Sequence, residues 1–207
     1  MSTSSQPDSA ALAGPPAVPG FPIWRLTVDQ YHTMIRMGVL GEDDPVELLE
    51  GWLVPKMPKK PAHSLATELV REAIEALLPA GWYVNSQEPI TLATSEPEPD
   101  IIVVRGGARD YADHHPGPQD LALVVEVADA SLQHDRTSKK RVYARAGVPV
   151  FWILNLSEGQ LEVFADPTGP AEQPDYRQQR VYGAAEAAPV LVEGTEIGQL
   201  SVSGVLP

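Results

Sequence analysis

The 207-residue chain has the length of one ordinary domain, and its composition excludes several classes of protein. Lys and Arg number 15 against 28 Asp and Glu, which leaves a net charge of −13. This balance argues against a general nucleic-acid coat, because such binding depends on many basic side chains that neutralise phosphates. Cysteine is absent, so disulfides, thiolate zinc sites and cysteine nucleophiles are excluded as well.

The first residues, MSTSSQPDSAALAGPPAVPG, have neither the basic start nor the continuous apolar core of a signal peptide. No apolar run approaches the roughly 20 residues that span a bilayer. We therefore expect a soluble, cytoplasmic protein without membrane contact. The Pro, Ser, Ala and Gly of residues 1–22 predict a disordered tail, and residues 23–207 are expected to form the folded domain.

Two helices, with a strand or a hairpin between them, are predicted in the first half of the domain. Thr27 is the expected N-cap of a helix in TVDQYHTMIRMG, which Gly38 ends. The segment VELLEGWLVP indicates a strand or a hairpin. Apolar residues at helical spacing from His63 predict an amphipathic helix in HSLATELVREAIEALL.

Short strands alternate with one helix in the second half. The runs WYVNSQEPITL, PDIIVV and LALVVEV predict three strands, and the last two are continuously apolar, as in strands buried on both faces. A helix over residues 135–146 leads into VFWILNL, so it is expected to cross over between strands. The segments QLEVFA and RQQRVY favour a β meander. The fold class is therefore α/β, with a central mixed sheet flanked by helices and an added meander.

Two carboxylates stand in the apolar strands, Asp100 at the start of IIVV and Glu126 near the end of LALVVEV. Buried carboxylates are costly unless they are paired or bind a metal. Asp100 could cap a turn after Pro99, and Glu126 could pair with Arg141 or Arg145. If the strands are antiparallel neighbours, however, the carboxylates meet and repel by about 4 kcal/mol at ~4 Å and an effective dielectric of about 20. A divalent cation such as Mg²⁺ would convert that repulsion into attraction.

The run PEPDIIVV followed by LVVEVADASLQHDRTSKKRVYARAGVPVFWILNL resembles the PD-(D/E)XK nuclease superfamily, in its Uma-two family of restriction-endonuclease-like domains. The segment LTVDQYHTMIRMGVLGEDDPVELLEGWLV and the AHS at 62–64 are similar to the family too, in the same order. The similarity extends from residue 24 to about residue 165. It implies a restriction-endonuclease-like core.

The resemblance implies roles for matching positions. Asp100 corresponds to the metal-binding aspartate and Glu126 to the acid of the (D/E)XK element. The lysine expected two positions later is replaced by Ala128, and the family run places it on the following helix, at Lys139. Tyr143 then shares a helix face with Lys139.

The resemblance also implies two auxiliary residues, each with a plainer alternative. Glu47 matches a glutamate that completes the metal shell, or it is a solvated side chain at the start of a strand. His63 matches a histidine at the start of the core helix, or it is an ordinary helix-start residue. The implied cofactor is Mg²⁺ or Mn²⁺.

The two acids and the lysine, together with this resemblance, predict a divalent-metal-dependent endonuclease that hydrolyses DNA phosphodiesters. The resemblance also implies a homodimer, since two symmetric sites most simply cleave both strands of a duplex. A non-catalytic nuclease-fold module that binds DNA or a protein partner is the alternative, and hydrolysis of another phosphate ester is a third interpretation. Zinc is not favoured, since the remaining histidines show no ligand spacing: His32, His114, His115 and His134. The basic clusters at 56–60 and 136–145 are either solvated helix faces or phosphate-binding surfaces.

Overall fold

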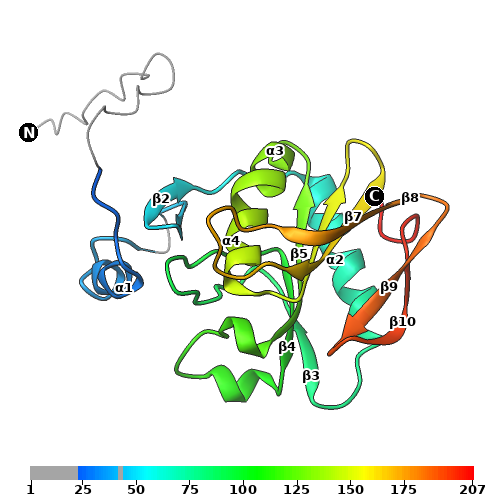
Figure 1. Ribbon diagram of the computed structural model, residues 1–207, viewed down its shortest axis with the longest axis horizontal. Coiled ribbons are helices and arrows are strands. Elements are labelled where there is room, and N and C mark those ends of the chain that lie inside the picture. Colours follow the sequence, from blue (N-terminus) through cyan, green and yellow to red (C-terminus); the bar gives the residue numbers. More distant parts are fainter. Residues whose placement is uncertain (1–22, 42–43) are drawn as a thin grey trace, which may run out of the picture.

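The computed structural model describes residues 23–41 and 44–207 of the chain. The tail predicted over residues 1–22 lies outside these residues. Figure 1 shows α1 (Val28–Arg36) and the strand pair β1 (Val46–Leu49) and β2 (Trp52–Pro55) to one side of a larger body built around a sheet. No helix in the described ranges is long and apolar enough to cross a membrane.

A six-stranded mixed sheet in the order β3-β4-β5-β6-β7-β8 organises the body. Its strands are β3 (Trp82–Asn85), β4 (Ile101–Arg105), β5 (Leu121–Ala128), β6 (Val150–Asn155), β7 (Gln160–Pro167) and β8 (Tyr176–Gly183). Only β5 and β6 pair in parallel, and the other neighbours are antiparallel. All residues of β5 and β6 and the first four residues of β4 are buried, which confirms the central placement predicted for β4 and β5 from their continuous apolar runs.

Helices lie on both faces of this sheet, and one of them belongs to the crossover connection that the parallel pair β5 and β6 requires. Helix α2 (Pro61–Glu75) packs Ala66, Val70 and Ile74 into one hydrophobic core. The connection from β5 to β6 runs through α3 (Leu132–His134), a π-helical turn (Asp135–Lys139) and α4 (Lys140–Ala146). Its Val142 and Tyr143 lie in the second core, on the opposite face. The predicted crossover helix is therefore confirmed (Figure 1).

The structure differs from the predicted elements in three places. The crossover helix begins three residues earlier than expected, at Leu132, and includes the π-helical turn. The run 82–92 is a strand only to Asn85, since Ile90 is buried without joining a ladder. A hairpin of β9 (Ala187–Val192) and β10 (Thr195–Ser201) was not predicted. It adds its buried side chains to the α2 core.

The predicted elements at the start of the domain are also present. Helix α1 (Val28–Arg36) begins with a capping box in which the Thr27 hydroxyl accepts a hydrogen bond from the Gln30 amide. Strands β1 (Val46–Leu49) and β2 (Trp52–Pro55) form a hairpin. Its two-residue turn has positive φ at both positions, 49° at Glu50 and 82° at Gly51, which is the hairpin geometry that matches strand twist.

The hairpin turn yields a stability prediction. A Cβ at Gly51 would lie 2.6 Å from Arg25 Cβ and 2.8 Å from the Leu26 carbonyl oxygen. We expect Gly51→Ala to lower the free energy of unfolding by roughly 2 kcal/mol or more, through collision and a disfavoured φ. Urea denaturation measures this loss. The control is Gly81→Ala, because Gly81 has a similar φ of 88° but no atom within 4 Å of the position that a Cβ would occupy. Equal losses of unfolding free energy in both variants would contradict the predicted steric clash at Gly51.

Candidate functional site

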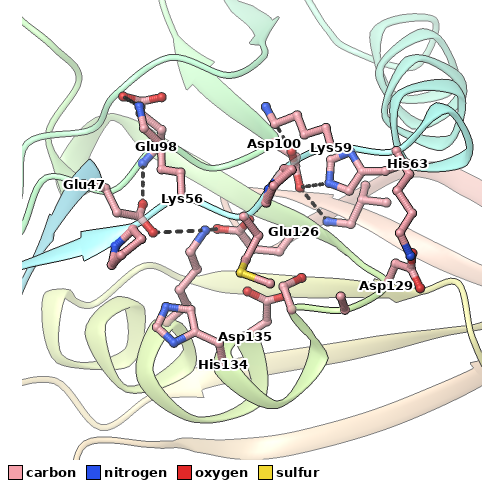
Figure 2. A pocket seen from close by; sticks show the side chains of 18 residues that line it. Glu47, Lys56, Lys59, His63, Glu98, Asp100, Glu126, Asp129, His134 and Asp135 are labelled. Atoms are coloured by element: carbon pink, nitrogen blue, oxygen red, sulfur yellow. Dashed lines mark hydrogen bonds and ion pairs between the residues drawn. The ribbon is translucent and has the colours of Figure 1, made fainter. Parts of the chain in front are cut away.

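One cavity of about 100 Å³ collects all five site residues predicted from the sequence. The antiparallel register of β4 and β5 sets Ile101 opposite Val125, so the next residues outward, Asp100 and Glu126, are neighbours. Figure 2 shows the side chains of Asp100, Glu126 and Glu47 directed into the same space. The five residues are Glu47, His63, Asp100, Glu126 and Lys139.

Asp100 is held by donors from two elements. Its Oδ2 accepts a hydrogen bond from the Val127 amide at 2.9 Å and lies 3.1 Å from His63 Nε2, on the first turn of α2. Its Oδ1 lies 3.7 Å from the Lys59 ammonium. Burial acts to raise the pKa of Asp100, but His63 and the Val127 amide outweigh it and hold the pKa below its usual range. Asp100 is therefore ionised.

Glu126 is the most constrained carboxylate of the cavity. Lys139 Nζ donates to its Oε1 at 2.8 Å, and the Tyr143 hydroxyl donates to the same oxygen at 2.6 Å. Burial raises the pKa of Glu126 to about 8, with Lys139 opposing the shift and Asp100 adding to it. Two donors therefore converge on Oε1, while Oε2 accepts no hydrogen bond from the described residues.

Lys139 lies between two carboxylates. Its ammonium is 2.8 Å from Glu126 and 3.8 Å from Glu47. Burial works against its charge, but these carboxylates raise the pKa of Lys139, so it remains a cation. The two arginines weighed as partners of Glu126 lie elsewhere, since Arg141 and Arg145 both pair with Glu50.

Glu47 is not a solvated side chain, which was one of the two alternatives that the sequence allowed. It is only 4% exposed, and its Oε2 accepts a hydrogen bond from the backbone amide of Glu98 at 3.1 Å. The β1 strand thus delivers a third carboxylate to the cavity that Asp100 and Glu126 line.

Asp135 is a fourth buried carboxylate, which the sequence reasoning missed. It lines the cavity, is 2% exposed, and its Oδ2 has no hydrogen-bond partner. Burial raises the pKa of Asp135, although Lys139 opposes the shift. The available signal was its position four residues before Lys139, which places both on one helix face. Asp135 lies in the π-helical turn, which no sequence pattern predicts. Such turns are frequent at functional sites.

The donor set fits a magnesium-like ion that keeps part of its water shell. No three His, Asp or Glu side chains in the described ranges converge to enclose a metal. Mg²⁺, however, is commonly held by one or two carboxylates, with waters and phosphate oxygens filling the other positions. Of the four carboxylate oxygens of Asp100 and Glu126, Asp100 Oδ1 and Glu126 Oε2 accept no hydrogen bond from a backbone amide, hydroxyl or imidazole of the described residues.

The remaining histidines are divided between two places. His134 lines the carboxylate cavity, whereas His32, His114 and His115 line a second cavity of about 740 Å³. His32 Nε2 lies 2.6 Å from the buried carboxylate of Glu96. Neither cavity brings together a group of three potential metal-ligating side chains among the described residues.

The sheet with its helical crossover and the carboxylate cavity define a nuclease-like fold. Residues 28–202 match the model of the Uma2 family, described as "Putative restriction endonuclease", and the chain belongs to this family. It is similar in structure to a protein from Anabaena variabilis described as "a putative nuclease belonging to DUF820", with a TM-score of 0.67. That match has 14% identity and covers 87% of this chain and 97% of the other. Comparison with curated proteins gives no match.

The raised pKa of Glu126 predicts how stability depends on pH. Because the folded pKa of about 8 lies above the ordinary value of 4.5, this group's contribution to stability is complete below pH 4.5. The contribution is lost as pH rises through about 8. Between pH 6 and pH 9 in EDTA, we expect the wild type to lose roughly 2 kcal/mol more unfolding free energy than Glu126→Gln.

Urea titrations at both pH values measure this difference. The control is Glu68→Gln, because Glu68 is an exposed side chain of α2 that does not line the cavity. Parallel pH profiles for the wild type and Glu126→Gln would show that Glu126 is already ionised in the folded protein.

Proposed function

We propose that the protein is a divalent-metal-dependent endonuclease that hydrolyses DNA phosphodiester bonds. The observation that carries this proposal is the convergence of Asp100, Glu126 and Lys139 in one buried cavity of a chain that belongs to the Uma2 family. Two carboxylates and a lysine are the groups that this hydrolysis requires, because charge develops on the phosphate oxygens and a water must be activated.

Asp100 and Glu126 would hold Mg²⁺ or Mn²⁺, with Glu47 as an auxiliary ligand. When bound, the metal supplies charge neutralisation at the phosphate and acidifies a water. His63 orients Asp100 from the start of α2 and leaves Oδ1 toward the cavity. Tyr143 and Lys139 engage Oε1 of Glu126 and leave Oε2 open.

Lys139 supplies the fixed positive charge of the site. It is 8% exposed and remains a cation because Glu126 and Glu47 surround it. A buried ammonium acts on the developing phosphate charge in a medium of low dielectric, where it is more effective than in water. Its position on the crossover helix explains how a chain with Ala128 in place of the motif lysine keeps this function.

A non-catalytic module that binds DNA or a protein partner is the second candidate. The observation that favours it is internal neutralisation, since Lys59 faces Asp100 and Lys139 donates to Glu126, so that the protein's own cations balance these acids. Calorimetric titration separates the two candidates. A folded protein that fails to bind Mn²⁺ at millimolar concentration would be the module.

The endonuclease proposal predicts cleavage of DNA in the presence of Mg²⁺ or Mn²⁺ and none in EDTA. Asp100→Asn and Lys139→Met should each lower the cleavage rate by at least about 100-fold, as expected for loss of a metal ligand or of a transition-state charge. Electrophoresis of supercoiled, linear and single-stranded substrates measures the rate. Arg71→Gln is the control because Arg71 pairs with Glu68 and Glu75 outside the cavity. Unchanged cleavage in either site variant would refute the assignment.

The expected homodimer remains part of this proposal. Cleavage of both strands of a duplex is most simply performed by two symmetry-related sites. Size-exclusion chromatography with light scattering should give a mass near twice the 22.3 kDa of one chain. A mass of one chain at micromolar concentration, for a protein that still cleaves DNA, would remove the dimer from the proposal.

A further inference from the structure

Lysine is concentrated at the carboxylate cavity. The chain has five lysines and ten arginines, all within the described residues. Four of the lysines line the cavity, and none of the arginines does: Lys56, Lys59, Lys60 and Lys139. A protein with a net charge of −13 has therefore placed most of its ammonium groups around one small space.

Three of these lysines belong to one short segment between β2 and α2, which we call the rim segment, residues 56–60. The segment has no helix or strand, so it is not the solvated helix face considered from the sequence. Pro58 lies within the segment, and Pro55 and Pro61 flank it; each proline restricts its own backbone φ. The backbone is thereby restrained, while the lysine side chains stay long and flexible.

Each rim lysine rests on an acid of the same cavity. Lys56 Nζ lies 2.6 Å from Glu98, and Lys60 Nζ lies 2.7 Å from Asp129. Lys59 Nζ lies 3.7 Å from Oδ1 of Asp100 (Figure 2). The three side chains are 32–65% exposed, so these ion pairs are weak enough to be exchanged for other anions.

Lys59 differs from the other two in the acid that it faces. Asp100 is one of the two carboxylates proposed to hold the metal, and its other oxygen is already engaged by Val127 and His63. A divalent cation and the Lys59 ammonium would therefore compete for Oδ1. When the ammonium is displaced, it stands at the cavity rim with its charge unpaired.

We propose that the rim segment binds the phosphate backbone of nucleic acid beside the cavity, and that Lys59 acts as an exchangeable counter-ion of Asp100 that is released to phosphate when a divalent cation binds. The inference rests on the proposed function and adds the substrate-contacting surface and its coupling to the metal. Because coupling between two ligands is reciprocal, the cation tightens nucleic-acid binding and nucleic acid tightens cation binding.

The charge distribution supports this location. The acidic chain repels a polyanion on average, so contact requires a place where ammonium groups are concentrated. The rim segment supplies three such groups within five residues, directly at the opening of the carboxylate cavity. A phosphate held there lies next to Asp100 and Glu126.

Metal affinity gives the first test. In Mn²⁺ titration calorimetry without DNA, Lys59→Gln should bind the ion roughly fivefold more tightly than the wild type, because the competing ammonium is gone. Lys60→Gln and Arg71→Gln remove the same charge without freeing Asp100, so they should change the affinity less than about twofold. Unchanged or weaker Mn²⁺ binding by folded Lys59→Gln would show that Lys59 does not compete with the cation for Asp100, and would overturn this part of the proposal.

Nucleic-acid affinity gives the second test, with the opposite sign. Fluorescence anisotropy with a labelled duplex in Ca²⁺, checked by electrophoresis for intact DNA, should show weaker binding by both Lys59→Gln and Lys60→Gln. The slope of log affinity against log salt should fall by about 0.9 for each phosphate that the variant no longer neutralises. Arg71→Gln should match the wild type. In addition, the ratio of DNA affinity in Ca²⁺ to DNA affinity in EDTA should be smaller for Lys59→Gln than for the wild type, and it should be unchanged for Lys60→Gln.

The outcomes distinguish this inference from the function on which it rests. If the wild type binds and cleaves DNA while both rim variants keep its affinity and salt slope, the rim segment is not the phosphate-binding surface, although the endonuclease proposal stands. If the wild type binds no DNA with any divalent ion, both proposals fail. Circular dichroism and urea titration establish that each variant is folded.

Discussion

The buried carboxylate of Glu126 is the constraint on which the rest of the site depends. It stands in β5, a strand buried on both faces, where burial opposes ionisation and a carboxyl group without hydrogen-bond partners would be prohibitive. The strand can carry it only because the crossover to β6 returns Lys139 and Tyr143 to the same oxygen. The position of the crossover helix is thus tied to Glu126 by electrostatics as well as by the apolar contacts of the second core.

The cavity neutralises its carboxylates with lysines of two kinds. Lys139 is buried between Glu126 and Glu47, so it is a permanent part of the charge balance. Lys59 is 41% exposed and rests on Asp100 at a longer distance, which suits an exchangeable partner. This division explains how one small space holds several acids together and still presents carboxylate oxygens to a cation.

The small hairpin of β1 and β2 contributes more than its size indicates. It delivers Glu47 from its first strand and leads directly into the rim segment from its second. An isolated bridge between Leu48 and Glu96 ties it to the loop before β4, which also carries Glu98 and Asp100. The tight turn at Gly51 fixes the register of β1 against β2. It thereby sets the position of Glu47 relative to the start of the rim segment.

Much of the fold and of the site follows from the sequence by itself. Continuous apolar runs determined the central strands, periodicity determined α1 and α2, and a charged residue inside a buried strand marked Glu126. The resemblance to a nuclease family then indicated Lys139 in place of the missing lysine at Ala128. These signals are local or lie in motifs of nearly constant spacing, so they can be read along the chain.

Only the tertiary structure decided which charges meet. Asp135 becomes a cavity residue through a π-helical turn, and Lys59 becomes the partner of Asp100 through packing of segments about 40 residues apart. Arg141 and Arg145, equally plausible partners of Glu126 in the sequence, are directed to Glu50 instead. Periodicity and composition specify where a side chain lies on its own helix or strand. Ion pairs depend instead on how these elements pack against one another. Because a long charged side chain can reach several acids, only the packing decides which of them it pairs with.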